Sequence, residues 1–560
     1  MSLKQEPELG KNFWLAMVLS MIVLIGYPQL LKWTTPQKTA GTGLSADSEM
    51  AGPNRETVET PAAQGVSTRK DFLSAAQKPE YTEFESANYK IHFSTLGGTV
   101  VYLEQRAESK PGAPGMVFYS QPEKNAPVLP GIFGIRLAHD PVDLTATVFK
   151  VKTADAGRGY FEFEYEKPGE YRLTKTFQIS AKTPTIQAGM ALQNLSGNER
   201  HYPLEFIFGM NYDPHDKTGM PYYEALAAGE KIESAKAHAI EKKGFFVEKP
   251  LAWSGLMRKY YVMAVRPEWK IIGQETHATA ERMLMQSTLR LDPLTLMPAE
   301  QVTRKFFVYA GPERYEALKK TGAGFEAMFS RGFFGIFKLW LLFTLKFIYR
   351  YIPNYGWCII LLTLLIKIIF APITNISFAS QRKMQVIQPK MKALQERYKG
   401  NAEKLHKETM ALFKRNRVNP MAGCLPMLVQ MPVLLAMYRV LPEAIELQGA
   451  PFIGWIHDLS QPDHFYMLPF TIPFLGWTAI NILPFLMIAS QYGFQKIMPQ
   501  PATTSDQTAM FAFMPLFFGF ICYNMPSGLV LYWFVQNVLS IVHHLLVSRA
   551  PVFLHHEDKE

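Results

Sequence analysis

Cysteine is scarce in this 560-residue chain, and its placement excludes one class of protein. The sequence has three cysteines, Cys358, Cys424 and Cys522, and all of them lie in apolar segments of the C-terminal half. The polar N-terminal half has none, which excludes a disulfide framework there. We expect the three thiols to behave as small buried hydrophobic groups rather than as redox centres.

Motifs for nucleotide hydrolysis and for nucleophilic catalysis are also missing. The sequence contains no G-x-x-x-x-G-K-[ST] loop and no G-x-S-x-G elbow. The stretch Asp213-Pro214-His215-Asp216 is more typical of a turn than of a metal cluster. In the pairs His543-His544 and His555-His556 the two histidines are adjacent and cannot lie on the same helix face, so they are not expected to be metal ligands. We therefore expect no catalytic residue, no metal and no cofactor.

Acidic residues are absent from the long apolar segments after residue 355, and basic residues gather between two of them. The stretch 382–417 holds 11 Lys or Arg against 3 Glu and supplies most of the net charge of +10. The later stretch 443–481 holds 4 acidic residues and no Lys or Arg. Basic loops between membrane spans stay in the cytoplasm, so the first stretch is predicted to be cytoplasmic and the second periplasmic. This placement argues against nucleic acid as the partner of the positive charge.

The N-terminal half divides into an anchor, a linker and a β-rich domain. Residues 1–33 contain an apolar run with no cleavage site close behind it, which predicts an uncleaved membrane anchor. Residues 34–78 are rich in small and polar residues and read as a flexible periplasmic linker. Period-two alternation and Gly-containing turns over 79–320 predict a large antiparallel β-sandwich, with a short helical insert around Tyr222 to Lys243.

The C-terminal half is predicted to be a membrane-embedded helical core, 355–549, followed by a short tail, 550–560. It is preceded by a helix at 331–350, whose Lys338 and Lys346 fall on one side and favour a position in the bilayer interface. The predicted spans cover about 357–376, 421–441, 483–497, 510–523 and 529–547. Six crossings, counting the anchor, place both termini in the cytoplasm and the β domain in the periplasm.

Lys367 lies well inside an apolar segment, where a lysine at the bilayer centre costs about 2.5 to 3.5 kcal/mol. It could snorkel to the cytoplasmic interface, or it could face a hydrated groove lined by protein. Since no acidic residue in these segments can pair with it, we favour the groove, with Thr363 one turn away on the same face. Gln536, Asn537 and Ser540 could line the same groove or form hydrogen bonds between helices.

The basic stretch 382–417 is predicted to form two short helices. Gly400 ends the first, Asn401 caps the second, and Pro389 kinks or restarts the first. Apolar residues, including Met384 and Met391, are spaced for one helix face. Two interpretations stay open: a helical hairpin that packs on itself, and a mobile methionine-bearing platform that receives apolar segments.

Several motifs resemble those of the YidC membrane protein insertase family in its Gram-negative form with a large periplasmic domain. They are Gln388-Pro389-Lys390-Met391, Val418-Asn419-Pro420-Met421-Ala422-Gly423-Cys424-Leu425-Pro426, Gln430-Met431-Pro432, Trp455-Ile456-His457-Asp458-Leu459 and Pro526-Ser527-Gly528-Leu529-Val530-Leu531-Tyr532. The resemblance implies a multi-domain membrane protein with a signal-anchor helix, a periplasmic all-β supersandwich, and a five-helix bundle enclosing a hydrophilic groove behind a cytoplasmic helical hairpin. It implies groove residues Lys367, Thr363, Tyr532, Trp533, Gln430 and Asn537, and hairpin residues Met384, Met391 and Met410.

The expected function is insertion and folding of nascent inner-membrane proteins, alone or beside the Sec translocon and its accessory subunits. Three departures from the family pattern matter. The family usually has arginine where this chain has Lys367, and usually tyrosine where it has Trp533. The tail is acidic, so a basic ribosome-binding extension is missing. The alternatives are an ion-coupled membrane transporter and a membrane-tethered periplasmic glycan-binding protein.

Overall fold

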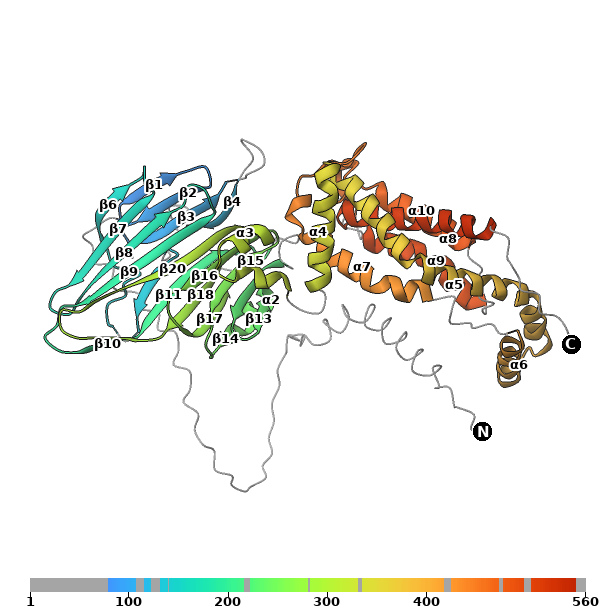
Figure 1. Ribbon diagram of the computed structural model, residues 1–560, viewed down its shortest axis with the longest axis horizontal. Helices are drawn as coiled ribbons and strands as arrows, with labels where there is room; N and C mark the ends of the chain where they lie inside the picture. Colours follow the sequence, from blue (N-terminus) through green and yellow to red (C-terminus); the bar gives the residue numbers. More distant parts are fainter. Residues whose placement is uncertain are drawn as a thin grey trace, which may run out of the picture. The chain divides into compact units, whose positions relative to one another are not determined.

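The computed structural model shows a β-rich region followed by a helical region (Figure 1). The predicted anchor and linker, residues 1–78, and the tail, 550–560, lie outside the residues that it describes. Those residues are 79–106, 115–121, 131–138, 140–215, 222–279, 283–330, 335–416, 425–472, 477–497 and 505–549.

The largest element of the β region is a nine-stranded sheet in the order β13-β12-β15-β16-β20-β9-β8-β7-β6, in which all neighbours pair antiparallel. Its strands are β6 (Lys150–Asp155), β7 (Tyr160–Lys167), β8 (Tyr171–Ile179), β9 (Thr185–Asn194), β12 (Glu224–Ala228), β13 (Ile232–Lys236), β15 (Trp253–Arg258), β16 (Tyr261–Pro267) and β20 (Gln301–Pro312). Buried and partly exposed residues alternate along most of β8. The period-two pattern of the sequence therefore marks the buried face of this sheet.

Two smaller sheets pack on the nine-stranded sheet. One is ordered β14-β17-β18-β11-β5 and the other β1-β2-β3-β4. Their strands are β1 (Tyr81–Glu85), β2 (Tyr89–Ser94), β3 (Thr99–Gln105), β4 (Met116–Ser120), β5 (Gly134–Leu137), β11 (Leu204–Asn211), β14 (Phe245–Val247), β17 (Ile271–Thr279) and β18 (Leu284–Leu291). The ring of Phe206 on β11 stacks on Phe306 of β20 at 3.8 Å, and Phe93 on β2 stacks on Phe161 of β7 at 4.5 Å. These contacts form a sandwich around one aromatic-rich core.

The predicted helical insert at 222–243 is wrong for most of its length. Only α2 (Ala237–Lys243) is helical, whereas β12 and β13 occupy the preceding residues. The sequence of β12, Glu-Ala-Leu-Ala-Ala, favours a helix when it is taken alone. Its backbone instead pairs with β13 on one side and β15 on the other, so the sheet overrides the local preference.

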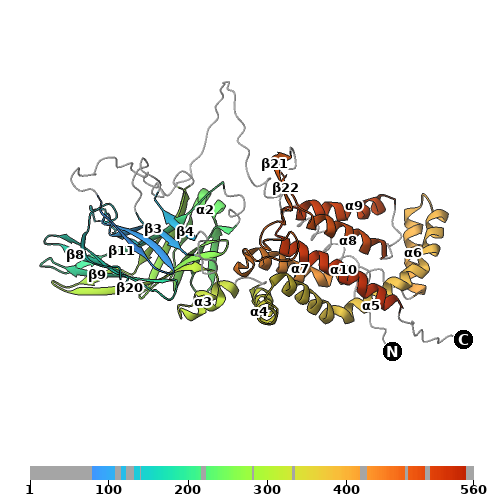
Figure 2. The same ribbon diagram turned by 90° about the horizontal axis from the view of Figure 1, so that it is seen from above.

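The helical region contains seven helices longer than 10 residues among the described residues, and α7 to α10 run roughly side by side (Figure 2). They are α4 (Gly335–Tyr351), α5 (Tyr355–Arg397), α6 (Ala402–Arg415), α7 (Leu425–Glu443), α8 (Leu483–Ile497), α9 (Ser505–Cys522) and α10 (Ser527–Arg549). Two stretches in them, Tyr355–Arg397 and Ser527–Val547, are long and apolar enough to cross a membrane. At about 1.5 Å per residue α8 is roughly 22 Å long, shorter than a hydrocarbon core of about 30 Å.

Helix α5 corrects the prediction for the basic stretch. The predicted span and the first hairpin helix are one helix of 43 residues, which contains both Pro372 and Pro389. Pro389 therefore does not restart a helix. The other features of the hairpin agree with the sequence: Gly400 has a φ of 98°, and the Asn401 side chain accepts a hydrogen bond from the backbone N–H of Lys404 at 3.0 Å.

The two lysines of α4 form ion pairs with carboxylates of the protein. The ammonium group of Lys338 lies 3.3 Å from a carboxylate oxygen of Glu313 and 3.1 Å from one of Glu443. Lys346 lies 2.9 Å from Glu446. Burial lowers the pKa of Lys338, but the two carboxylates outweigh it and raise that pKa above its usual range. The two lysines thus share one side of the helix, as the sequence predicts, and the position of α4 in the bilayer interface stays a prediction.

Candidate functional site

One face of α10 carries polar side chains into an otherwise apolar helical region. Tyr532, Gln536, Ser540 and His544 follow one another at intervals of four residues and are all largely buried. This spacing places them on one face of the helix. Helix α10 packs against α5, α7 and α8, which supply the partners of this face. We call this set, with its hydrogen-bond partners, the polar row.

Lys367 of α5 joins the polar row through a hydroxyl group. Its ammonium group donates a hydrogen bond to the Ser540 hydroxyl oxygen at 2.6 Å, and that hydroxyl donates to the backbone carbonyl of Gln536 at 2.7 Å. Within the described residues, no carboxylate forms an ion pair with Lys367. The ammonium group thus contacts a neutral group of α10, and the groove position of Lys367 stays a prediction.

The end of the polar row nearest the start of α10 links three side chains from two helices. Gln430 of α7 donates from its amide nitrogen to the Tyr532 hydroxyl oxygen at 2.8 Å. The amide nitrogen of Gln536 donates to the Gln430 carbonyl oxygen at 3.0 Å. The structure thus brings together two of the groove residues that the resemblance implies, Tyr532 and Gln430, and adds Gln536 between them and Ser540.

The remaining expected groove residues have different environments. Asn537 donates to the Ser490 hydroxyl of α8 at 3.1 Å, so it connects α10 with a third helix. The ring of Trp533 is partly buried and lies 5.2 Å from the Phe518 ring of α9. Thr363 is fully buried, and its hydroxyl donates to the carbonyl of Ile359 in its own helix at 2.6 Å. That hydrogen bond satisfies the Thr363 hydroxyl inside its own helix.

Several buried polar atoms of the row have no hydrogen-bond partner within the described protein. They are the amide oxygens of Gln491 and Gln536 and the Nδ1 atoms of His543 and His544. Buried polar groups without a protein partner are ordinarily satisfied by water. His543 also contacts Asn375 of α5, with Nε2 and Oδ1 2.8 Å apart. The sequence reasoning missed Asn375, Ser490 and Gln491, although polar residues inside apolar segments were the available signal.

The helical hairpin formed by the C-terminal part of α5 and by α6 has a small core of its own. Ile387, Met391 and Phe413 are buried there, with Met384 packed against them. Met410 is 46% exposed. Two of the three expected methionines therefore stabilise the hairpin, and only Met410 lies on an outward face.

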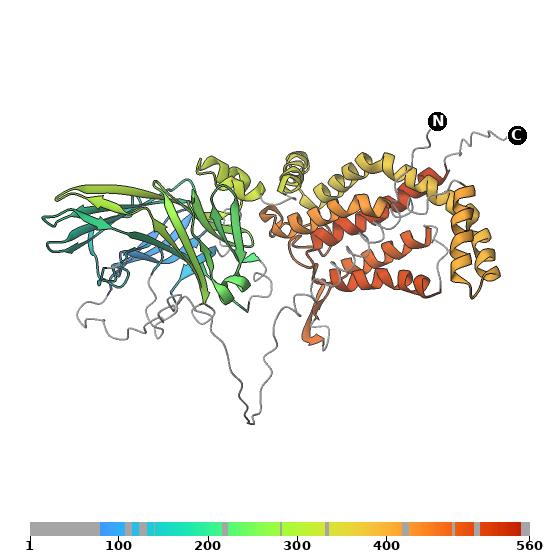
Figure 3. The ribbon, with the colours of Figure 1, turned by 90° about the horizontal axis from the view of Figure 1, so that it is seen from below.

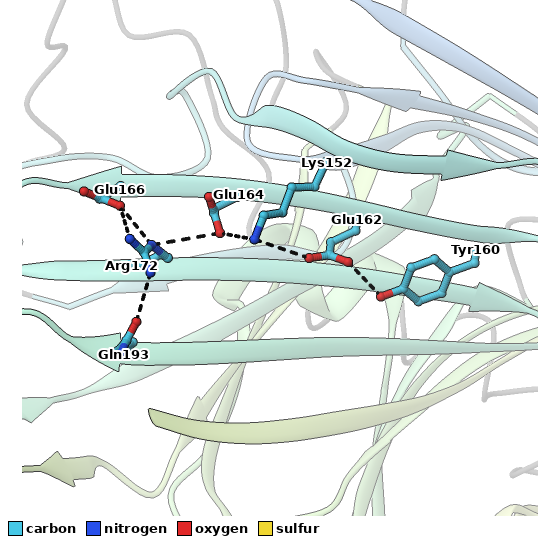
Figure 4. Close-up of polar contacts among 7 residues, drawn as sticks. All are labelled: Lys152, Tyr160, Glu162, Glu164, Glu166, Arg172 and Gln193. Atoms are coloured by element: carbon cyan, nitrogen blue, oxygen red, sulfur yellow. Dashed lines mark hydrogen bonds and ion pairs between the residues drawn. The ribbon is translucent and has the colours of Figure 1, made fainter. Parts of the chain in front are cut away.

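The acidic residues of β7 do not form a free carboxylate pair for sugar chemistry. Figure 4 shows Glu162, Glu164 and Glu166 in a row, with Lys152 and Arg172 between them. The Lys152 ammonium lies 2.7 Å from Glu164, and the Arg172 guanidinium lies 2.7 Å from Glu166. Each carboxylate has a cationic partner on a neighbouring strand, and Glu162 also accepts a hydrogen bond from Tyr160 of its own strand, which is typical of a solvated sheet face.

Comparison with known proteins matches both regions of the chain. The family described as 60Kd inner membrane protein matches residues 347–553, and the family described as YidC periplasmic domain matches residues 82–344. A membrane protein insertase YidC from Geobacter metallireducens is 30% identical over 552 residues, which cover 96% of this chain and 98% of the relative. One from Pelobacter propionicus is 37% identical over 324 residues, which are 58% of this chain and 59% of that relative. A solved structure described as an active YidC insertase with the first transmembrane domain resolved covers 83% of this chain and 92% of its own, at 15% identity and a TM-score of 0.34.

Proposed function

Because the chain belongs to the YidC family of membrane protein insertases, we propose that the polar row of α10 lines the groove through which it moves hydrophilic parts of its substrates. The observation that carries the proposal is the Lys367–Ser540 contact, which leaves a cation among neutral groups inside apolar helices. A cation in this environment attracts acidic residues of an incoming polypeptide. The attraction is stronger than in bulk water because the effective dielectric constant is lower.

The groove is hydrated in this proposal. The partnerless atoms of Gln491, Gln536, His543 and His544 support it, because each can bind water that the protein does not replace. Water inside the helical region shortens the hydrocarbon path that a hydrophilic tail must cross. The hydrogen bonds of Gln430 with Tyr532 and Gln536 fix α7 and α10 relative to each other along this path.

The apolar segment of the substrate moves to the lipid side of the groove. Its transfer out of water releases roughly 25 cal/mol per Å² of apolar surface. No nucleotide is required, since hydrophobic partitioning and the membrane potential drive the step. The hairpin of α5 and α6 lies at the cytoplasmic opening of the groove. The exposed thioether of Met410 is available there to contact apolar segments of the substrate.

Five helices, α5, α7, α8, α9 and α10, cross the inner membrane in this proposal, together with the N-terminal anchor. Both termini and the basic hairpin then lie in the cytoplasm, and the β region lies in the periplasm. The partners are nascent inner-membrane proteins, the lipid bilayer, and the Sec translocon with its accessory subunits. A ribosome contact is weaker, because the tail after Arg549 holds acidic residues.

Charge reversal at Lys367 tests the proposal. We expect Lys367→Arg to keep insertion activity, because the positive charge and a donor to Ser540 remain. Lys367→Glu should reduce the insertion of a single-span client with an acidic translocated tail at least about tenfold, which corresponds to ~1.4 kcal/mol. The measurement is protease protection of the tail in proteoliposomes.

The matched control is the same client with its tail acids changed to Asn and Gln. Lys367→Glu should affect this neutral client far less, because only the electrostatic step has been removed. Equal loss for both clients would point to a misfolded groove. Normal insertion of the acidic client by Lys367→Glu would refute the electrostatic role of Lys367.

A further inference from the structure

A two-stranded antiparallel hairpin, β21 (Tyr466–Ile472) and β22 (Trp477–Ile480), lies within the stretch that the sequence marks only as a periplasmic loop. Residues 465–480 contain no Asp, Glu, Lys, Arg or His, and their few polar side chains are threonines. The acidic residues of the surrounding stretch all precede it. The hairpin is thus an uncharged, aromatic-rich element in a region that is expected to face water.

Both faces of β21 expose apolar side chains. Tyr466 is 57% exposed, and Phe470, in the irregular part of the strand, is 60% exposed. Met467 is 59% exposed and, as the next residue of the regular part, lies on the face opposite to Tyr466. A strand that packs on its own protein buries one of its faces, but this strand buries neither. Exposed apolar surface of this kind marks a site that interacts with a lipid or a protein.

The base of the hairpin is fixed to the ends of two helices. One carboxylate oxygen of Asp463 accepts hydrogen bonds from the backbone N–H groups of Ile482 at 2.8 Å and Leu483 at 2.9 Å, where α8 begins. The ring of Trp477 stacks on Tyr523, directly after α9, at 3.6 Å. The position of the hairpin relative to α8 and α9 is therefore set by several independent contacts.

The hairpin extends sideways from these helices. In Figures 2 and 3 it projects across the axes of α8 and α9 rather than continuing along them. If α8 and α9 cross the bilayer, as proposed above, a projection across their axes runs along the membrane surface at this end. The strand edges are open, so their backbone groups need water or headgroups, which excludes a deep position in the hydrocarbon.

We infer that the β21–β22 hairpin lies in the headgroup region of the periplasmic leaflet and fixes the depth of α8 and α9 in the bilayer. Aromatic side chains favour this interface, where a ring can be partly apolar and partly hydrated. The occupant of both exposed faces is lipid, because a bilayer surrounds an inserted hairpin whereas a docked protein covers one face. The hairpin has no cationic residue, so this docking requires neither anionic lipid nor low salt.

Depth-dependent fluorescence quenching in proteoliposomes tests the inference. Cys358, Cys424 and Cys522 are changed to Ala, and one cysteine is introduced at Phe470 and labelled with bimane. The vesicles are phosphatidylcholine with acyl chains brominated either near the headgroup end or near the chain terminus. Leu516 on α9, 55% exposed, is the positive control for the proposed crossing, and Phe246 on β14, 56% exposed, is the matched negative control.

We expect the Phe470 label to be quenched, and more strongly by bromine near the headgroup end, with no dependence on salt. The Leu516 label should be quenched and the Phe246 label should not. Quenching at Leu516 without quenching at Phe470 would overturn the inference and leave the membrane crossing of α9 intact. No quenching at Leu516 would instead overturn the proposed crossing. If Phe470→Cys folds poorly, Tyr466→Cys, which is 57% exposed on the same strand, gives the same readout.

Discussion

At the scale of single residues, Lys175 shows how the β region accommodates a cation in its core. It occupies a core-facing position on β8 and is 2% exposed. Its ammonium group donates to the carbonyl oxygens of Gly97 at 2.8 Å and Phe133 at 2.9 Å. Burial lowers the pKa of Lys175 from 10.5 to about 7. The side chain therefore links two loops to the nine-stranded sheet. Near pH 7 its charged and neutral forms are present in similar amounts in the folded protein.

This pKa predicts a pH dependence of stability. Between pH 7 and the ordinary lysine pKa, the unfolded chain binds more protons than the folded chain, so the free energy of unfolding should rise with pH. The limiting slope from this residue is about 1.4 kcal/mol per pH unit. Lys175→Met should abolish this rise while keeping the volume of the side chain. Urea unfolding of the β region at pH 7, 8 and 9 measures it, and equal slopes in both proteins would contradict the prediction.

The sequence identifies the important residue types of the polar row but not all of their partners. Lys367 stands out because a lysine inside an apolar segment is costly, and its neighbours on α10 stand out by their spacing. The orientation of a hydroxyl group is not encoded in such a pattern. Thr363 shares the face of Lys367 yet donates to Ile359, whereas Ser540 binds the cation. These outcomes depend on which helices meet, which one-dimensional spacing does not determine.

At the scale of elements, the hairpin of α5 and α6 combines a correct and an incorrect prediction. Gly400 and Asn401 mark the turn as expected. Pro389 was expected to kink or restart the first helix, because proline costs about 3 kcal/mol inside a helix, and the continuous α5 excludes the restart. The hydrophobic contacts of Ile387 and Met391 with Phe413 on α6 help offset this cost. A rule for an isolated helix cannot include such a contact.

The small core of the hairpin predicts low local stability. Backbone amides of α6 should exchange with deuterium faster than those of α10, because few buried side chains hold α6 in place. Phe413→Ala should accelerate the exchange of α6 further by removing a largely buried ring, whereas Met410→Ala on the exposed side of the same helix should not. Hydrogen exchange with mass spectrometry measures all three. Protection of α6 equal to that of α10 would show that the hairpin is docked rather than self-packed.

The β21–β22 hairpin could not be predicted from the sequence by the usual signals. Its strands are mostly apolar rather than alternating, and β21 leaves both of its faces exposed. Pro469 within β21 argues against a central strand, but each strand of a two-stranded sheet has a free edge where proline is tolerated. A strand that contacts lipid and a strand buried in a protein core have the same apolar sequence pattern. The sequence therefore does not distinguish between these two environments.

At the scale of the whole molecule, the polar row and the β region are separate in sequence, although a second core cluster joins β-region residues such as Trp253 to Tyr532 of the row. Every residue of the row lies after Phe333, and the largest core cluster contains only β-region residues. We expect deletion of residues 79–312, with the anchor and linker kept, to leave insertion largely intact. The deletion ends before Glu313, which keeps its ion pair with Lys338. Complementation of a YidC-depleted strain measures the outcome.

The matched control for this deletion is the same variant with Glu313→Gln. Lys338 then keeps only Glu443 as a carboxylate partner in a largely buried position, so α4 should be less stable and insertion lower. Loss of insertion from a stably expressed deletion that retains Glu313 would show that the β region acts directly in insertion.

The continuity of α5 has a mechanical consequence. A helix of 43 residues measures about 64 Å along its axis, and it carries Lys367 in one part and the first arm of the hairpin in the other. Pro372 lies between them and lacks the backbone N–H that would stiffen the helix at that point. A bend of about 10° there would sweep Arg397 through roughly 6 Å, from a lever arm of about 37 Å. In the proposed mechanism, contact of a nascent chain with the hairpin would therefore exert torque at a pivot about one and a half turns from Lys367, the cation proposed to attract its acidic tail.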